Sequence, residues 1–144
     1  MPFRKKIDDG AERLAKIDLF DGFTPAELAR VAELVEEIEA EQGAVLTEQG
    51  KPGGEAYIVV EGNAAFEVAG ERKGSIGPGE LIGEMALIDN RPRVGTVRAL
   101  SPMKLLALDA AQFRKLLDEM PKANRAIMSK ITDRLRQMDL GGER

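Results

Sequence analysis

The residues of this chain best suited to chemistry lie in one stretch, GELIGEMALIDNRPRVGTV, which occupies positions 79–97. Gly83 precedes a short helical pattern whose first backbone N–H groups lack internal partners and favour an anion, and its missing side chain lets an anion approach closely. Pro92 fixes the backbone ahead of Arg93, whose planar guanidinium can direct two donors at one phosphate. Glu84 only accepts hydrogen bonds when it is ionised, so it suits a neighbouring hydroxyl. Together these residues indicate a site for a single phosphate attached to a ring that bears a hydroxyl.

The amino-acid composition excludes several other kinds of site. The 144 residues contain no cysteine and no histidine, which removes thiol nucleophiles, Ser-His pairs and metals ligated by either residue. The sequence also lacks a D-x-D-x-D-G calcium loop, so we expect neither an enzyme nor a metal site. The net charge of −4, without a basic stripe, argues against nucleic acid as a partner.

The apolar segments indicate where the protein resides. The longest runs, such as YIVV, are far too short to span a bilayer, and no apolar segment of a signal peptide follows the basic start MPFRKK. We therefore expect a cytoplasmic protein without a membrane partner. A chain of this length fits a single domain over residues 1–144.

Helices are predicted at the N-terminal end, over residues 8–34. Apolar residues at near-helical spacing predict one helix over 8–20, and a second helix follows, with Thr24 as its N-cap and Pro25 at its first position. The segment VEEIEAE after it fits either a continuing helix or a strand, and we prefer a strand over its second half. The glutamates at 36–41 are expected to form a solvated face.

The chain from 36 to 109 predicts a β-roll, and the chain from 110 to 140 predicts helices. Short segments closed by glycines, such as EAYIVVEG and NAAFEVAG, are typical of strands joined by tight turns. We therefore predict an α+β fold that is mainly β: an antiparallel β-roll, or jelly-roll, with N-terminal helices, a short phosphate-binding helix and C-terminal helices. The last helix is expected to begin at Pro121 and to stop at Gly141. Its apolar residues form a seam that suits either packing onto the roll or a homodimer contact through the 121–140 helix: Ile127, Ile131, Leu135 and Met138.

The stretch 79–97 resembles the phosphate-binding cassette of the cyclic nucleotide-binding domain. This family includes modules of catabolite activator proteins, protein kinase A regulatory subunits and cyclic-nucleotide-gated channels. The positions that match its pattern are Gly83, Glu84, Met85, Ala86, Leu87, Ile88, Pro92, Arg93 and Thr96. Segments before and after the cassette, such as LFDGFTPAEL and VRALSPMKLLALD, are also similar to the family, so the resemblance covers about residues 15–140.

The resemblance implies a role for each residue of the cassette. Arg93 would pair with the exocyclic phosphate oxygens of a cyclic nucleotide, and Glu84 would accept a hydrogen bond from the ribose 2′-hydroxyl. Backbone N–H groups around Gly83, Met85 and Ala86 would complete the phosphate site. The helix from Pro121 would cap the base, and its candidate capping residues are Arg134, Leu135 and Met138.

Two positions depart from the family pattern. After the arginine the family usually has a small residue or one with a hydroxyl, then alanine, whereas this chain has Val94 and Gly95. Val94, which follows Arg93 in the binding stretch, cannot donate to a guanine edge, so its presence favours cAMP over cGMP. Gly95 is expected to add backbone freedom to the cassette.

The resemblance therefore implies a regulatory, signal-transducing domain that binds cAMP through Gly83–Thr96 and relays it through the C-terminal helices to an effector protein. No cofactor besides this ligand is expected. The alternative is a degenerate fold with a silent pocket that acts as a dimerisation or protein-interaction module, in which Arg93 is a surface residue paired with Glu84 or Asp89. No helix-turn-helix pattern follows the last helix, so we expect a stand-alone domain or a fragment of a larger protein.

Overall fold

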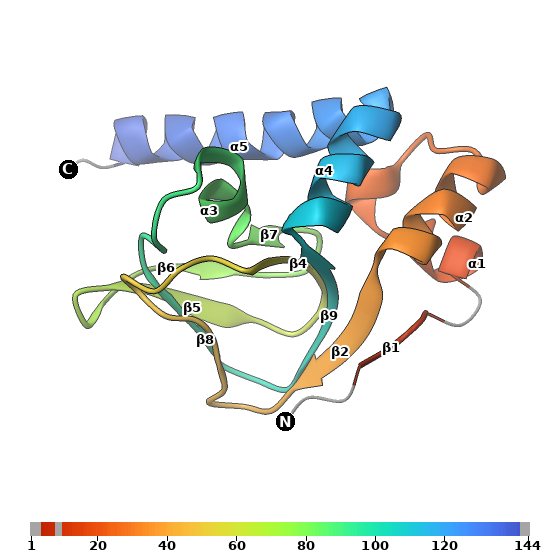
Figure 1. The fold of residues 1–144 in the computed structure, drawn as a ribbon. Coiled ribbons are helices and arrows are strands. Elements are labelled where there is room, and N and C mark those ends of the chain that lie inside the picture. Colours follow the sequence, from red (N-terminus) through yellow and green to blue (C-terminus); the bar gives the residue numbers. More distant parts are fainter. Residues whose placement is uncertain (1–3, 8–9, 142–144) are drawn as a thin grey trace.

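The structure is a computed structural model that describes residues 4–7 and 10–141; the side chains of Asp89 and of residues 137–141 lie outside the description. Figure 1 shows a roll of two β-sheets with one long helix, α5, running across one end of it, above the short helix α3. Helix α5 spans Pro121–Gly141 and α3 spans Glu84–Asp89. Within the described residues, no helix has both the length and the apolar character needed to cross a membrane.

Both sheets are antiparallel, and this confirms the predicted fold class. The first sheet has the strand order β1-β2-β9-β4-β7 and the second has the order β3-β8-β5-β6. The strands of the first sheet are β1 (Arg4–Lys5), β2 (Glu36–Ala40), β9 (Met103–Asp109), β4 (Glu55–Glu61) and β7 (Leu81–Ile82). Those of the second are β3 (Val45–Thr47), β8 (Thr96–Ala99), β5 (Ala64–Val68) and β6 (Glu71–Ile76).

The N-terminal helices differ in part from the prediction. The single helix expected over 8–20 is wrong, because α1 spans only Gly10–Leu14 and a separate 3₁₀ turn, η1, spans Asp18–Phe20. Ile17 and Leu19 would face opposite sides of a continuous helix with about 3.6 residues per turn. The break between the two elements lets both side chains enter the core.

The next helix, α2 (Pro25–Leu34), begins as the sequence predicts. The Thr24 hydroxyl accepts a hydrogen bond from the Glu27 N–H at 3.1 Å, and the Glu27 carboxylate accepts one from the Thr24 N–H at 2.7 Å. This capping box, together with Pro25 at the first position, fixes where the helix starts. The ambiguous segment after α2, for which we preferred a strand over the second half only, forms the strand β2 over nearly its whole length.

The core has two parts, separated by the first sheet. Side chains alternate between the two faces of a strand. On β4, Ile58 therefore packs against the helices, while Tyr57 and Val59 pack inside the roll. Tyr57 is a core residue in this arrangement. The helix-facing part of the core holds the roll against α2, α4 (Ala110–Glu119) and α5.

The predicted solvated face of glutamates is wrong at one position. Glu37 is 4% exposed, and its carboxylate accepts hydrogen bonds from the Arg13 guanidinium, one of them at 3.1 Å. The ammonium group of Lys5 lies 3.8 Å from the same carboxylate. The bonds from Arg13 hold the pKa of Glu37 below its usual range. A charged residue was expected in water, but these cations make its burial possible.

The apolar seam of α5 divides into two halves. Ile127 is fully buried and Ile131 packs against the helix-facing core, so the first half serves packing onto the domain. Leu135, by contrast, is 45% exposed, and the side chain of Met138 lies outside the description. The homodimer contact through this helix stays a prediction, and it concerns the second half of the seam.

Candidate functional site

The cassette is built around the short helix α3, between two residues in the left-handed region. Gly83 precedes the helix with φ 78° and Asn90 follows it with φ 58°. A Cβ atom at Gly83 would lie 2.1 Å from Nη1 of Arg93 and 3.1 Å from the backbone oxygen of Glu55. A glycine is therefore required at position 83 for two reasons: the left-handed backbone conformation and the close approach of the Arg93 guanidinium.

Arg93 lies inside the domain, not on its surface. Arg93 is only 8% exposed. Its guanidinium donates a hydrogen bond from Nη1 to the Gly83 carbonyl at 2.8 Å and another from Nη2 to the Glu55 carbonyl at 2.6 Å. In the part of the chain that the structure describes, it forms no ion pair with a carboxylate. The surface pair of Arg93 with Glu84, considered as an alternative above, is not formed. Glu84 instead accepts a hydrogen bond from Arg134.

The surroundings of Arg93 leave its charge only partly compensated. Burial lowers the pKa of the Arg93 guanidinium, because the charged form loses water, and the nearby Tyr57, Glu55 and Glu84 act in the opposite direction. Two backbone carbonyls satisfy two of the donors, so further N–H groups of the planar fork stay available. A bound anion would offset the cost of burying this cation.

The backbone at Gly53 also lies against Arg93. A Cβ atom at Gly53 would lie 2.5 Å from Cβ of Ala86, 3.2 Å from Cζ of Arg93 and 3.3 Å from its Nε. The chain just before β4 therefore passes directly beside the guanidinium. Our sequence analysis missed Gly53 and Glu55; the only signal was the glycine pair 53–54 immediately before a strand.

Glu84 is the second polar group of the site and is 1% exposed. Its Oε2 accepts a hydrogen bond from Nη1 of Arg134 on α5 at 2.7 Å, and Nη2 of Arg134 donates to the Leu81 carbonyl at 2.9 Å. Among the described residues, no group donates a hydrogen bond to the other oxygen, Oε1. A buried carboxylate oxygen without a donor is costly, so Oε1 is suited to accept from a ligand hydroxyl.

The remaining predicted site residues lie around these two groups. Ala86 is buried and Met85 is half-buried on α3, whereas Pro92 is exposed. Val94 is 59% exposed, next to the buried Arg93. Of the residues expected to cap a base, Arg134 bonds to Glu84, Leu135 is exposed, and the side chain of Met138 is outside the description.

Gly95 has a packing role that the sequence did not reveal. Its φ is not in the left-handed region, so backbone freedom does not explain it. A Cβ atom at this position would lie 2.5 Å from the ring carbon Cε1 of Phe66 and 2.7 Å from the backbone oxygen of Glu67. The Phe66 ring on β5 thus fills the space that the family's alanine would occupy.

A Gly95→Ala variant should be less stable than the wild type by about 1–3 kcal/mol, because the added methyl group overpacks this contact. Thermal unfolding measures the change. Gly74→Ala is the matched control, since a Cβ atom there would meet nothing within 4 Å. Adding Phe66→Leu to Gly95→Ala should recover part of the loss. Equal melting temperatures for Gly95→Ala and Gly74→Ala would contradict this account.

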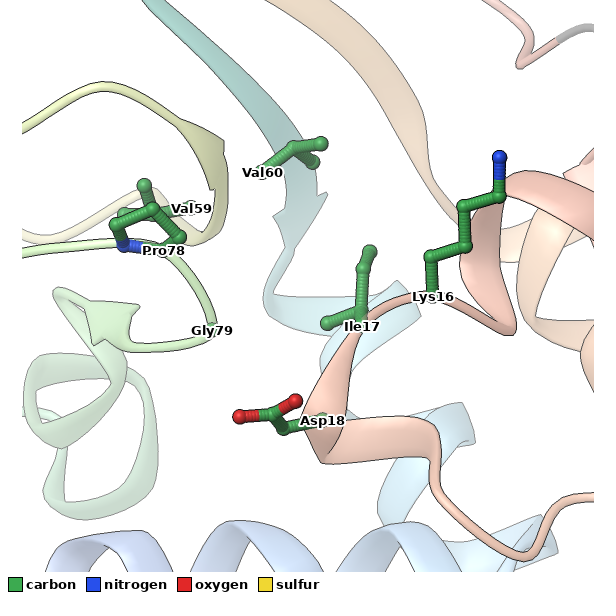
Figure 2. Close-up of a pocket in the computed structure, with 7 residues that line it drawn as sticks. All are labelled: Lys16, Ile17, Asp18, Val59, Val60, Pro78 and Gly79. Atoms are coloured by element: carbon green, nitrogen blue, oxygen red, sulfur yellow. The ribbon is translucent and has the colours of Figure 1, made fainter.

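Two small hollows lie away from Arg93, and the second of them adjoins Arg134 of the site. One, of about 90 Å³, lies between η1 and the turn before β7, and Figure 2 shows the Asp18 carboxylate pointing toward Pro78 and Gly79 while the Lys16 amine points away. The other, of about 190 Å³, lies beside Arg134 under α5. Neither is lined by Arg93, and both are smaller than usual small-molecule sites of about 300 Å³ or more. No group of acidic side chains suited to a metal ion occurs within the residues described.

Comparison with known proteins gives consistent matches. A family model described as the cyclic nucleotide-binding domain matches residues 37–120. A cyclic nucleotide-gated potassium channel of Mesorhizobium japonicum is 36% identical over 109 residues, which are 76% of this chain and 30% of the channel. The chain spans less than a third of the length of the curated relatives that head the comparison.

Solved structures show the same fold. The catabolite activator protein of Thermus thermophilus is 30% identical, with a TM-score of 0.74, over 85% of this chain and 60% of that one. The regulatory domain of protein kinase A from Toxoplasma gondii, solved with cAMP, is 26% identical, with a TM-score of 0.73, over 87% of this chain and 49% of that one.

Proposed function

The chain belongs to the cyclic nucleotide-binding domain family, as its cassette predicted, and from this premise we propose that it senses cAMP and relays binding through α5. One observation carries the proposal: among the described residues, the same cassette holds a buried guanidinium without a carboxylate partner and a buried carboxylate oxygen without a donor. These are the two complements of a phosphate and a ribose hydroxyl.

In the proposed complex, Arg93 binds the exocyclic oxygens of the cyclic phosphate. The carbonyls of Gly83 and Glu55 already orient the guanidinium, so little side-chain entropy is lost when the ligand binds. The first N–H groups of α3, at Met85 and Ala86, add donors to the phosphate. Glu84 accepts from the ribose 2′-hydroxyl through Oε1, the oxygen that Arg134 leaves unoccupied.

Val94 supports the assignment of cAMP rather than cGMP. Its exposed side chain follows Arg93 and carries no hydroxyl that could donate to a guanine base. The similar regulatory domain of protein kinase A from Toxoplasma gondii was solved with cAMP, which supports the same assignment by analogy.

Calorimetric titration with cAMP, cGMP and 5′-AMP tests the proposed function. We expect cAMP to bind most tightly, cGMP more weakly, and 5′-AMP much more weakly, because an open phosphate carries more charge and no longer fixes the ribose. Absence of heat and of a thermal shift at millimolar concentrations of all three nucleotides would contradict the proposal. The silent-pocket alternative would then be preferred.

The proposed relay runs through Glu84 and Arg134. Because one carboxylate faces both the ribose hydroxyl and α5, a ligand that orders Glu84 also changes how firmly α5 is held over the cassette. The output is then a partner protein or a second copy of the chain that contacts α5. Leu135 is an exposed residue of the seam and is available to such a partner.

An Arg134→Met variant is expected to bind cAMP within about tenfold of the wild type, but to lose the effect of cAMP on hydrogen exchange in α5. The reason is that the hydrogen bond from Arg134 on α5 to Oε2 of Glu84 is removed, while Oε1 and Arg93 remain. Lys130→Met, one helical turn earlier, is the matched control and should keep the wild-type response. If α5 in Arg134→Met still responds fully to cAMP, the relay does not pass through this pair.

A further inference from the structure

The side chain of Arg4 joins the edge strand β1 to the phosphate-binding region. Arg4 pairs through its backbone with Ile38 on β2, yet its guanidinium reaches Glu55 at the start of β4, although β2 and β9 separate the two strands in the sheet. Nη2 of Arg4 donates to Oε1 of Glu55 at 2.5 Å, and Nη1 donates to Oε2. The pair is bidentate, which is the strongest geometry for an arginine and a carboxylate.

Glu55 connects this pair to Arg93, because its two ends bind two different arginines. Its carboxylate binds Arg4, and its backbone carbonyl accepts from Nη2 of Arg93 at 2.6 Å. The hydroxyl of Tyr57 also donates to Oε1 of Glu55, at 3.2 Å. The Glu55 carboxylate therefore lies close to the guanidinium that is proposed to bind phosphate, yet it is directed at another cation.

The charges around Glu55 show what would follow without Arg4. The pKa of Glu55 lies below its usual range, mainly because of the hydrogen bonds from Arg4, and the Arg93 charge also contributes. Arg93 is thus the second cation that acts on this carboxylate. A Glu55 carboxylate freed from Arg4 would be attracted to Arg93 and would occupy the donors that a phosphate needs.

We propose that Arg4 is a positioning residue that keeps the Glu55 carboxylate away from Arg93 and so leaves the guanidinium available for an anion. Its effect on nucleotide affinity rests on the proposed function. The contact itself does not, and it can be tested without a nucleotide. The strand β1 thereby gains a role in the site in addition to its backbone pairing with β2.

The binding experiment uses the full chain and cAMP in calorimetric titrations of Arg4→Met, Glu55→Gln and the double variant. Arg4→Met is expected to weaken binding on the order of tenfold, whereas the double variant should bind like Glu55→Gln, because the competing carboxylate is gone. Lys5→Met is the matched control: it removes a charge from the same strand, and the Lys5 ammonium lies 3.8 Å from Oε1 of Glu37. A double variant as weak as Arg4→Met, or an Arg4→Met equal to Lys5→Met, would overturn the proposal.

A second measurement separates this proposal from the proposed function. The Nε–H signal of Arg93 in the nucleotide-free protein is observed with ¹⁵N-labelled arginine and is assigned by its loss in Arg93→Lys. We expect this signal to shift in Arg4→Met, to stay in place in Lys5→Met, and to return in the double variant. If the wild type bound no nucleotide, such a shift would still support the role of Arg4. An unshifted signal in Arg4→Met would overturn that role whatever the nucleotide result.

Discussion

An Arg93→Ala variant is expected to bind cAMP at least about a hundredfold more weakly than the wild type, a loss of about 3 kcal/mol. The substitution removes the charged fork that is proposed to bind the phosphate and that donates to the carbonyls of Gly83 and Glu55. Calorimetric titration of the purified variant measures the change.

Two controls separate the lost phosphate contact from damage to the fold. The carbonyls of Gly83 and Glu55 lose their donor in Arg93→Ala, so its thermal unfolding must be recorded at the same time. Arg91→Ala removes the same charge two residues away, from an exposed position, and should bind cAMP nearly as well as the wild type. If Arg93→Ala and Arg91→Ala bound equally well, Arg93 would not be the phosphate ligand.

Gly83→Ala should weaken cAMP binding by about tenfold or more and should destabilise the fold by about 1–2 kcal/mol. The stability term arises because alanine is strained at φ 78°. The binding term arises because the new methyl group would lie 2.1 Å from Nη1 of Arg93, so the guanidinium must leave its position between the two carbonyls. Thermal unfolding and calorimetric titration measure the two terms separately.

Gly70→Ala is the matched control for this substitution. Gly70 has φ 80° in the turn between β5 and β6, and a Cβ atom there would meet nothing within 4 Å. It should lose a similar amount of stability and keep the wild-type affinity for cAMP. An equal loss of affinity in both variants would show that backbone strain, not displacement of Arg93, is responsible.

Local patterns in the sequence predicted most of the fold. The capping box at Thr24 and the glycine-bounded strands depend on residues close together in the chain, so their types and spacing are sufficient. The same holds for the cassette, where Gly83 and Arg93 lie within one short stretch. The predicted single helix over 8–20 was wrong because its apolar residues fit a helical period only in part. Packing of Ile17 and Leu19 into the core is possible only with a break between α1 and η1.

Contacts between distant residues could not be predicted in the same way. The pairs of Glu37 with Arg13, Glu84 with Arg134 and Glu55 with Arg4 join residues that are 24, 50 and 51 positions apart. No local pattern distinguishes these arginines from others in the chain. The sequence therefore predicted that Glu84 accepts a hydrogen bond from a hydroxyl. Only the structure shows that, among the described residues, Arg134 donates to Oε2 and no group donates to Oε1.

A crystal structure of the chain with cAMP tests the central claim most directly. The account predicts phosphate oxygens within hydrogen-bond distance of the Arg93 guanidinium and the ribose 2′-hydroxyl on Oε1 of Glu84, with Oε2 still facing Arg134. The account would be contradicted if the cassette stayed empty at saturating cAMP, or if the nucleotide bound elsewhere while Arg93 contacted only the Gly83 and Glu55 carbonyls.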